Sequence, residues 1–234
     1  MYNDIQSWVS TCVDCALKKG DPKSKLGKYS QIHTEKPLDL IATDIMGPLP
    51  QTEKGNKYII LFMDHFSRWI EAIAAKSTDS KTLANKFIKH IICKHGTPKQ
   101  LLSDCGSNYT SILLKDVMET LQVQHLKTAT YHHQSNGMVE HMAKTLESML
   151  AMYVNYHQSD WDTLLPYTAF TYNTTINDTT GQIPFKVIYG REPSFPDDIV
   201  EHMDQSGPVQ KYTENVVAKL QQVYQEVQKF TQDI

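Results

Sequence analysis

The sequence predicts a mixed α/β fold, with a five-stranded sheet flanked by helices. Three apolar strand patterns follow one another between residues 38 and 73, which favours an antiparallel meander. Between residues 80 and 127 the pattern then alternates as helix, strand, helix, strand, and only helical patterns follow residue 137. A sheet of this kind is covered on both faces, so the 234 residues are enough for one sizeable core with appendages.

The strands of the meander are bounded by turn-forming residues. The first, 38–44, stops before the Gly47-Pro48 pair, and the second, 58–63, is entirely apolar. The third, 68–73, alternates along the chain, as expected of a strand with one exposed face. The two later strands are shorter and are predicted at 100–104 and 123–127.

Apolar side chains at helical spacing predict the helices. The first covers 80–95, with Ser77 or Thr78 as its cap. A second helix precedes residue 123, and its apolar face is formed by Leu113, Leu114, Val117, Met118 and Leu121.

The C-terminal part is predicted to be helical except for one loop. Helices are expected at 137–157, 161–173 and 208–230, and the segment 179–191 is expected to be a loop. The buried stripe of the first of these helices is predicted to contain Met142, Leu146, Met149, Leu150 and Tyr153. By analogy, this order of elements matches the ribonuclease H-like architecture.

Composition narrows the class of protein. The net charge of −3 argues against nucleic-acid binding driven by the protein's overall charge, but it does not exclude local contacts. No apolar run approaches the length of a transmembrane helix, and the first residues lack a signal-peptide pattern. Four scattered cysteines do not form a disulfide framework, which favours a reducing intracellular setting.

Three carboxylates stand at positions where the predicted elements end or begin. Asp44 ends the first strand, Asp104 ends the fourth, and Glu140 lies on the first turn of the long helix. Acidic side chains that converge repel one another unless a cation lies among them, and oxygen ligands select Mg2+ or Mn2+. The hypothesis is a metal-dependent phosphoryl-transfer site. On composition alone, other acids compete for these roles: Asp39, Asp64 and Asp116.

Cys12 and Cys15 form a lone CxxC pair on a predicted short helix. Such a pair is half of a zinc site, because structural zinc takes four ligands. Two free thiols on a helix are the alternative.

Several motifs around the three acids resemble those of a known family. They are Thr43-Asp44-x-x-Gly47-Pro48-Leu49-Pro50, Asp64-x-Phe66-Ser67-Arg68, Leu102-Ser103-Asp104-x-Gly106-Ser107-Asn108, His132-x-Gln134-Ser135-Asn136-Gly137-x-Val139-Glu140, Tyr172-Asn173-Thr174-Thr175 and Gly181-x-x-Pro184-Phe185-x-x-x-Tyr189-Gly190-Arg191-x-Pro193. With 35 residues between Asp104 and Glu140, the pattern is similar to the catalytic core of retroviral and retrotransposon integrases. Its style is that of Ty3/Gypsy LTR retrotransposons, whose integrases are parts of a Pol polyprotein.

The resemblance implies a polynucleotidyl transferase and endonuclease that trims the 3′ ends of the element's DNA and joins them to target DNA. It implies that Asp44, Asp104 and Glu140 are catalytic and hold Mg2+ or Mn2+. It also implies DNA contacts by Lys144, Gln134, Ser135 and Asn136. The implied partners are double-stranded DNA and further copies of the chain, with no membrane. The implied location is the nucleus, after synthesis in the cytoplasm.

The resemblance also implies a domain organisation. Residues 1–20 would be the remnant of a His-His-Cys-Cys zinc domain, followed by a linker at 21–36 and the catalytic core at 37–196. Residues 197–234 would form a linker and a C-terminal helix. Cys12 and Cys15 would bind zinc only with a histidine pair upstream in the parent protein.

This chain departs from the family pattern close to the predicted site. Cys105, His133, His141 and Glu147 stand where the family usually has other residues. These departures and the net charge of −3 favour an alternative interpretation. The chain would then be a catalytically inactive, integrase-derived module for DNA binding or dimerisation. A ribonuclease H-type nuclease would share the carboxylate chemistry, but the motifs after Glu140 argue against it.

Overall fold

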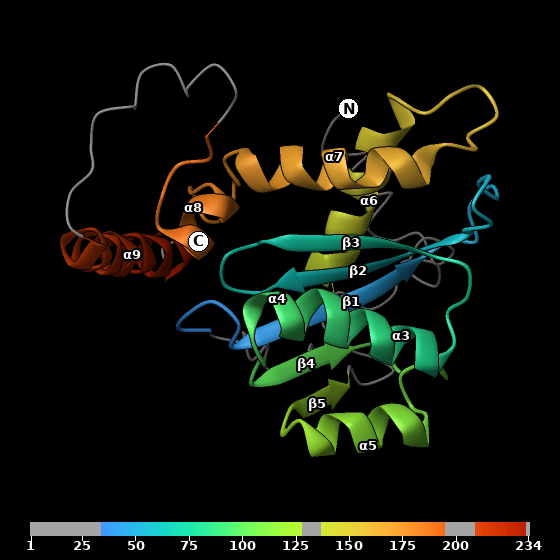
Figure 1. Ribbon diagram of the computed structural model, residues 1–234, viewed down its shortest axis with the longest axis horizontal. Coiled ribbons are helices and arrows are strands. Elements are labelled where there is room, and N and C mark those ends of the chain that lie inside the picture. The colour runs from blue at the N-terminus through green and yellow to red at the C-terminus, as the bar shows by residue number, and fades with distance from the viewer. Residues whose placement is uncertain (1–33, 128–136, 195–208, 233–234) are drawn as a thin grey trace, which may run out of the picture. The chain divides into compact units, whose positions relative to one another are not determined.

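In the computed structural model, which describes residues 34–127, 137–194 and 209–232, a five-stranded sheet has the order β3-β2-β1-β4-β5. Figure 1 shows this sheet between its helices. The strands are β1 Leu40–Met46, β2 Tyr58–Asp64, β3 Ile70–Ala75, β4 Gln100–Ser103 and β5 Gln124–Lys127. The first three pair antiparallel, whereas β4 pairs parallel with both β1 and β5. The predicted mixed sheet and its meander are therefore confirmed.

Two strands of the meander begin two residues later than predicted, for a backbone reason. Leu38 and Arg68, the first residues of the predicted strands, both have left-handed φ values of 65°. A non-glycine residue in this region cannot continue a strand. The extended chain therefore begins only at Leu40 and at Ile70.

The long helix predicted at 80–95 is present, with a π-helical turn inside it. It consists of α3 Ser80–Phe87, η1 Ile88–Ile92 and α4 Cys93–His95. Its cap is Asp79 and not Ser77 or Thr78, because the Asp79 carboxylate accepts the backbone N–H of Thr82 at 2.9 Å. Ser77 instead donates its hydroxyl to the same carboxylate.

The remaining helices are α5 Ile112–Thr120, α6 Gly137–Ala151, α7 Trp161–Thr174, α8 Pro184–Tyr189 and α9 Val209–Gln232. Helix α6 ends well before the predicted residue 157, so Tyr153 lies outside the helix and is 70% exposed instead of buried. Leu113 on α5 is likewise exposed, whereas its neighbour Leu114 is buried.

Helix α8 lies where the sequence predicts a loop. Pro184 occupies its first turn, where a missing N–H costs nothing. Gly190 ends it with a left-handed φ of 68°. At six residues the helix is too short to produce a clear periodic pattern, which explains why the prediction is wrong here.

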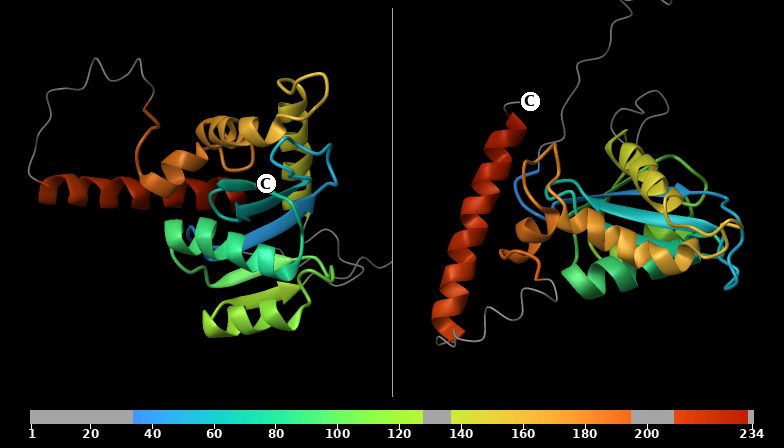
Figure 2. Two further views of the ribbon diagram at one scale, coloured as in Figure 1. Left: turned by 45° about the vertical axis from the view of Figure 1, so that its right-hand side comes forward. Right: turned by 90° about the horizontal axis from the view of Figure 1, so that it is seen from above.

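Helices cover both faces of the sheet, as Figure 2 shows. The helices α3 and α5 pack on one face, in a core whose largest aromatic side chains are Phe62 and Phe87. Helix α6 packs against β1 and β2 on the other face, with Val139 and Leu146 fully buried. This placement brings the first turn of α6 to the sheet strand that carries Asp44.

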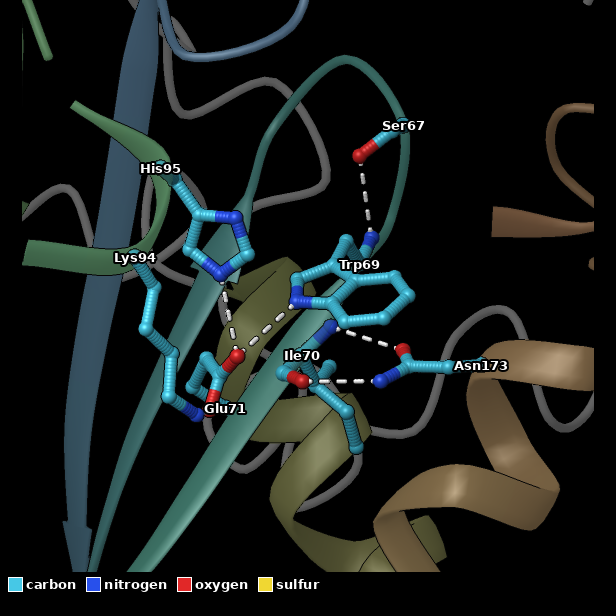
Figure 3. A network of polar contacts seen from close by, with 7 residues as sticks. All are labelled: Ser67, Trp69, Ile70, Glu71, Lys94, His95 and Asn173. Atoms are coloured by element: carbon cyan, nitrogen blue, oxygen red, sulfur yellow. Dashed lines mark hydrogen bonds and ion pairs between the residues drawn. The ribbon is translucent and has the colours of Figure 1, made fainter. Parts of the chain in front are cut away.

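Helix α7 closes the free edge of the sheet at β3. Figure 3 shows how the Asn173 side chain pairs with the backbone of Ile70. Its amide nitrogen donates to the Ile70 carbonyl and its oxygen accepts the Ile70 N–H, each at 2.9 Å. One side chain thus supplies both hydrogen bonds that a neighbouring strand would give at this position.

The C-terminal helix α9 packs on α8 and on the turn after β2. Val223 and Val227 are buried there together with Phe66 and Val187. In the described part of the chain, no helix is long and apolar enough to span a membrane.

Candidate active site

The parallel pairing of β1 and β4 places Asp44 and Asp104 at the same level of the sheet. Ala42 is paired with Leu102; Asp44 lies two residues further along β1, and Asp104 lies two residues after Leu102, directly beyond the end of β4. The carboxyl ends of parallel strands meet at one edge of a sheet, where α/β proteins usually build their sites. Neighbouring strands are about 5 Å apart, so Asp44 and the residue that follows β4, Asp104, lie near each other at this edge.

Gly106 lets the chain turn closely around the Asp104 carboxylate. The Gly106 N–H donates to Asp104 Oδ1 at 3.0 Å. A side chain at this position would start only 3.0 Å from the same oxygen. The Asp-x-Gly motif therefore orients an otherwise exposed carboxylate through a backbone contact.

A buried tyrosine, which the sequence analysis did not single out, joins the two aspartate segments. The hydroxyl of Tyr109, on the turn after Asp104, lies 3.2 Å from Thr43 Oγ1, directly before Asp44. Burial, and then the charges of Asp104 and Asp44, raise the pKa of Tyr109 well above its usual range. Tyr109 therefore stays a neutral hydroxyl that positions both segments. Its place one residue after the Gly-Ser-Asn motif is the only sequence signal for it.

The strand before Asp104 has a second polar anchor that sequence reasoning missed. Ser103 Oγ lies 2.9 Å from His125 Nε2 on β5 and 2.9 Å from the Asp104 carbonyl oxygen. Burial, and then the charge of Lys127, lower the pKa of His125, which favours the neutral imidazole. This contact links the last residue of β4 to β5.

Glu140 approaches from helix α6. It shares a cavity of about 260 Å³ with Asp44, Gly47 and two further side chains of α6, Lys144 and Glu147. A side chain at Gly47 would come within 2.7 Å of the Lys57 carbonyl oxygen, so this position requires glycine. The structure thus brings together the predicted Asp44, Glu140 and Lys144 in one cavity.

The electrostatics of Asp44 reflect this arrangement. Burial is the main cause that raises the pKa of Asp44. A hydrogen bond from the Ile45 N–H lowers this pKa, and the charges of Glu140 and Asp104 raise it further. A carboxylate whose ionisation is disfavoured by two neighbouring acids matches the oxygen donor set that a hard divalent cation prefers.

The three carboxylates form an open arrangement. In the part of the chain that the structure describes, no group of three or more histidine, cysteine or acidic side chains is gathered closely enough to hold a metal ion. The donor chemistry fits Mg2+ or Mn2+, while the side chains are not drawn together around a common point.

Part of the chain matches a known protein family. Residues 34–133, which include β1 to β5, Asp44 and Asp104, match the integrase core domain family. Residues 34–133 are therefore similar to an integrase core domain.

The relatives of this chain include two polyproteins and one integrase-like protein. The chain is 28% identical over 162 residues to the retrovirus-related Pol polyprotein from transposon 412 of Drosophila melanogaster, covering 69% of this chain. It is 30% identical over 195 residues, or 82% of its length, to the Gag-Pol polyprotein of avian reticuloendotheliosis virus. It is 23% identical over 199 residues, or 83% of its length, to a Gypsy retrotransposon integrase-like protein 1 of Bos taurus. The chain spans only 13%, 17% and 38% of these relatives' own lengths.

Solved structures with the same fold include two integrases. A simian T-cell lymphotropic virus intasome in complex with PP2A regulatory subunit B56 gamma aligns with a TM-score of 0.62 at 18% identity, over 89% of this chain and 73% of that chain. The integrase catalytic core domain of HTLV-2 in complex with magnesium, in a trimeric form, aligns with a TM-score of 0.54 at 17% identity, over 66% and 98% respectively. These similarities establish the ribonuclease H-like fold of the integrase core domain.

Cys12, Cys15, Gln134, Ser135 and Asn136 lie outside the described residues, and their predicted roles stay predictions.

The three acids that compete with the predicted triad on composition alone, Asp39, Asp64 and Asp116, lie elsewhere in the fold. Asp64 is 2% exposed and accepts hydrogen bonds from the backbone of Leu38 and from Ser67. Asp39 forms an ion pair with Lys99 at 2.8 Å, and Asp116 is exposed on α5. None of the three lines the cavity that Asp44 and Glu140 share.

Proposed function

We propose that this chain carries out metal-dependent polynucleotidyl transfer in the integration of retroelement DNA. In this proposal it trims the 3′ ends of the element and joins them to target DNA. The observation that supports the proposal is that the charges of both Glu140 and Asp104 act on the Asp44 carboxyl and raise its pKa.

In the proposed reaction, Asp44, Asp104 and Glu140 hold Mg2+ or Mn2+. When bound, such ions supply Lewis-acid stabilisation of the phosphodiester and activation of the attacking hydroxyl or water. The chain's own contribution is to fix the acids in place. Tyr109 and Thr43 hold the two aspartate segments together, and the packing of α6 on the sheet holds Glu140.

Lys144 is the residue of this cavity that we assign to the DNA. It lies one turn after Glu140 and lines the same cavity, where its ammonium group can pair with a backbone phosphate. The proposed partners are double-stranded DNA and further copies of the chain, and the proposed place of action is the nucleus. The intasome and the trimeric magnesium complex among structures of similar fold support this direction.

The test is a joining assay with donor oligonucleotides that carry the element's terminal sequence, in Mg2+ or Mn2+. We expect joined and nicked products with the wild type and none with Asp104→Asn. The matched control, Asp116→Asn on the exposed face of α5, should retain activity. If the wild type produces neither joined nor nicked DNA in Mn2+, the enzymatic proposal fails for this chain.

The alternative proposal is an inactive integrase-derived module that binds DNA or dimerises. The open arrangement of the three acids and the net charge of −3 favour it. The same joining assay separates the two proposals. An inactive module forms no product either as the wild type or as Asp104→Asn, and the two proteins bind DNA equally well.

A further inference from the structure

Arg68 is a buried arginine whose guanidinium is only partly satisfied. It lies in the turn between β2 and β3 and is 4% exposed. Its Nη1 donates to the carbonyl of His65 and contacts the sulfur of Met138. Within the described part of the chain, its buried Nε has no hydrogen-bond partner. A buried donor on a charged group is costly to leave unpaired, so this nitrogen requires an explanation.

The buried acid Asp64 does not provide the missing contact. Asp64 is fully buried and interacts with Arg68 through its charge, but its oxygens accept hydrogen bonds from Leu38 and Ser67. Burial lowers the pKa of Arg68 to about 10, so the guanidinium remains charged at neutral pH.

Arg68 forms part of the wall of a second cavity, of about 320 Å³. The apolar part of this wall is formed by Ile176 and four methionines: Met63, Met138, Met142 and Met149. Tyr172, Thr145 and the loop 175–179 complete it. Its volume is within the range of small-molecule sites, and methionine side chains adapt to ligands of varied shape.

We propose that this cavity binds a small organic carboxylate with an apolar body. The carboxylate would accept from the Arg68 guanidinium where this side chain lines the cavity, and the apolar body would lie among the methionines. A carboxylate suits the site better than a phosphate, because Asp178 lines the cavity and Asp64 lies behind Arg68. A single guanidinium with two acids nearby disfavours binding of a dianion.

This site is separate from the one that carries the proposed function. His141, Met142 and Thr145 of α6 face this cavity, whereas Glu140, Ala143, Lys144 and Glu147 of the same helix face the cavity beside Asp44. A ligand here would contact the helix that carries Glu140 without touching the three acids. Its binding is measured without DNA, so the outcome is independent of catalytic activity.

The test is an NMR titration of the full chain with three probes: 4-phenylbutyrate, 4-phenylbutanol and inorganic phosphate. The chain has only two arginines, so an Arg191→Lys variant assigns the Nε–H resonance of Arg68. We expect 4-phenylbutyrate to shift this resonance and the methyl resonances of the four methionines. The neutral alcohol should bind about tenfold more weakly, because it lacks the charge-assisted hydrogen bond. Phosphate should leave the methionine methyls unchanged.

Two matched variants on α6 test whether the ligand occupies the cavity, and both leave Arg68 in place. Thr145→Phe fills the cavity and should abolish the shifts. Ser148→Phe places the same side chain on the exposed face of the helix and should preserve them, since both residues make the same hydroxyl contact to the preceding turn. The proposal would be overturned if 4-phenylbutyrate and 4-phenylbutanol bound equally well, or if phosphate shifted the methionine methyl resonances as 4-phenylbutyrate does. Unweakened binding of 4-phenylbutyrate by Thr145→Phe would also overturn it. So would the lack of any shift with 4-phenylbutyrate at millimolar concentration.

Discussion

Glu147 is the side chain whose charge conflicts most with DNA binding at the proposed site. It lines the same cavity as Asp44, Glu140 and Lys144, so acids outnumber the cation there. A phosphate that approaches Lys144 meets this carboxylate one turn further along α6.

We expect Glu147→Gln to tighten binding of double-stranded DNA about two- to fivefold at low ionic strength, with the gain disappearing as salt rises. Fluorescence anisotropy over a salt series measures this. Glu119→Gln, an exposed acid on α5 away from the cavity, should change binding little. Equal or weaker binding by Glu147→Gln would show that this carboxylate does not face the DNA.

Tyr109 is a positioning residue, and its hydroxyl is the part that matters. Tyr109→Phe leaves Thr43 without its buried partner and should cost about 1 kcal/mol of unfolding free energy. Joining activity should fall further than this stability loss explains, because Thr43 adjoins Asp44. Urea denaturation and the joining assay measure the two effects.

The double variant Tyr109→Phe/Thr43→Val provides the control. With both polar partners removed, no buried group is left unpaired, so its unfolding free energy should be at least that of Tyr109→Phe. Additive losses would instead show that the two hydroxyls do not interact.

Among elements, the edge strand β3 depends on Asn173. Its side chain makes two hydrogen bonds to Ile70 from a position that is 3% exposed (Figure 3). Asn173→Ala should lower the unfolding free energy by about 2–4 kcal/mol, since both Ile70 backbone groups lose their partner. Thr174→Ala, the next residue of α7, is the control and should lower the unfolding free energy much less.

Hydrogen exchange of the Ile70 amide measures the same contact locally. The exchange must be faster in Asn173→Ala than in the wild type, and an unchanged rate would contradict this role of Asn173.

A charged network ties β3 to the end of α4. Glu71 accepts from Lys94 at 2.8 Å and from His95 at 3.0 Å, and the Trp69 indole donates to it at 3.3 Å (Figure 3). Burial by itself raises the pKa of Glu71, but the hydrogen bonds and charges of His95 and Lys94 outweigh it and leave the pKa below its ordinary value of 4.5.

The sign of the pH dependence follows from this lowered pKa. The folded state holds the Glu71 proton less tightly than the unfolded state. The network's stabilisation is therefore fully present above pH 4.5 and is lost as pH falls through the folded pKa. Denaturation of wild type and Glu71→Gln should differ most near neutral pH and converge in acid. A constant difference across this range would exclude the linkage.

Element identity was readable from the sequence wherever apolar spacing was regular. The five strands and the long helices were predicted from it, and the structure confirms them. Boundaries set by single backbone conformations were not readable. Leu38 and Arg68 delay β1 and β3 because their φ values are positive, which no apolar pattern reveals. Helix α8 and the exposure of Tyr153 similarly depend on tertiary packing and not on local periodicity.

For the whole molecule, spacing alone identified the three acids only as candidates among several. The motif resemblance selected them, and the β1–β4 register together with α6 packing explains why these residues approach one another. Tyr109, His125 and the Arg68 cavity were missed, because their roles arise from contacts between distant segments. The sequence has no pattern for such contacts.

The central claim, a divalent cation held by Asp44, Asp104 and Glu140, is tested most directly by isothermal titration with Mn2+. We predict a saturable heat for the wild type, its loss in Asp104→Asn, and its retention in Asp116→Asn. Circular dichroism should show the same fold for all three proteins. The claim is contradicted if the wild type gives no heat, or if Asp104→Asn binds Mn2+ as well as the wild type does.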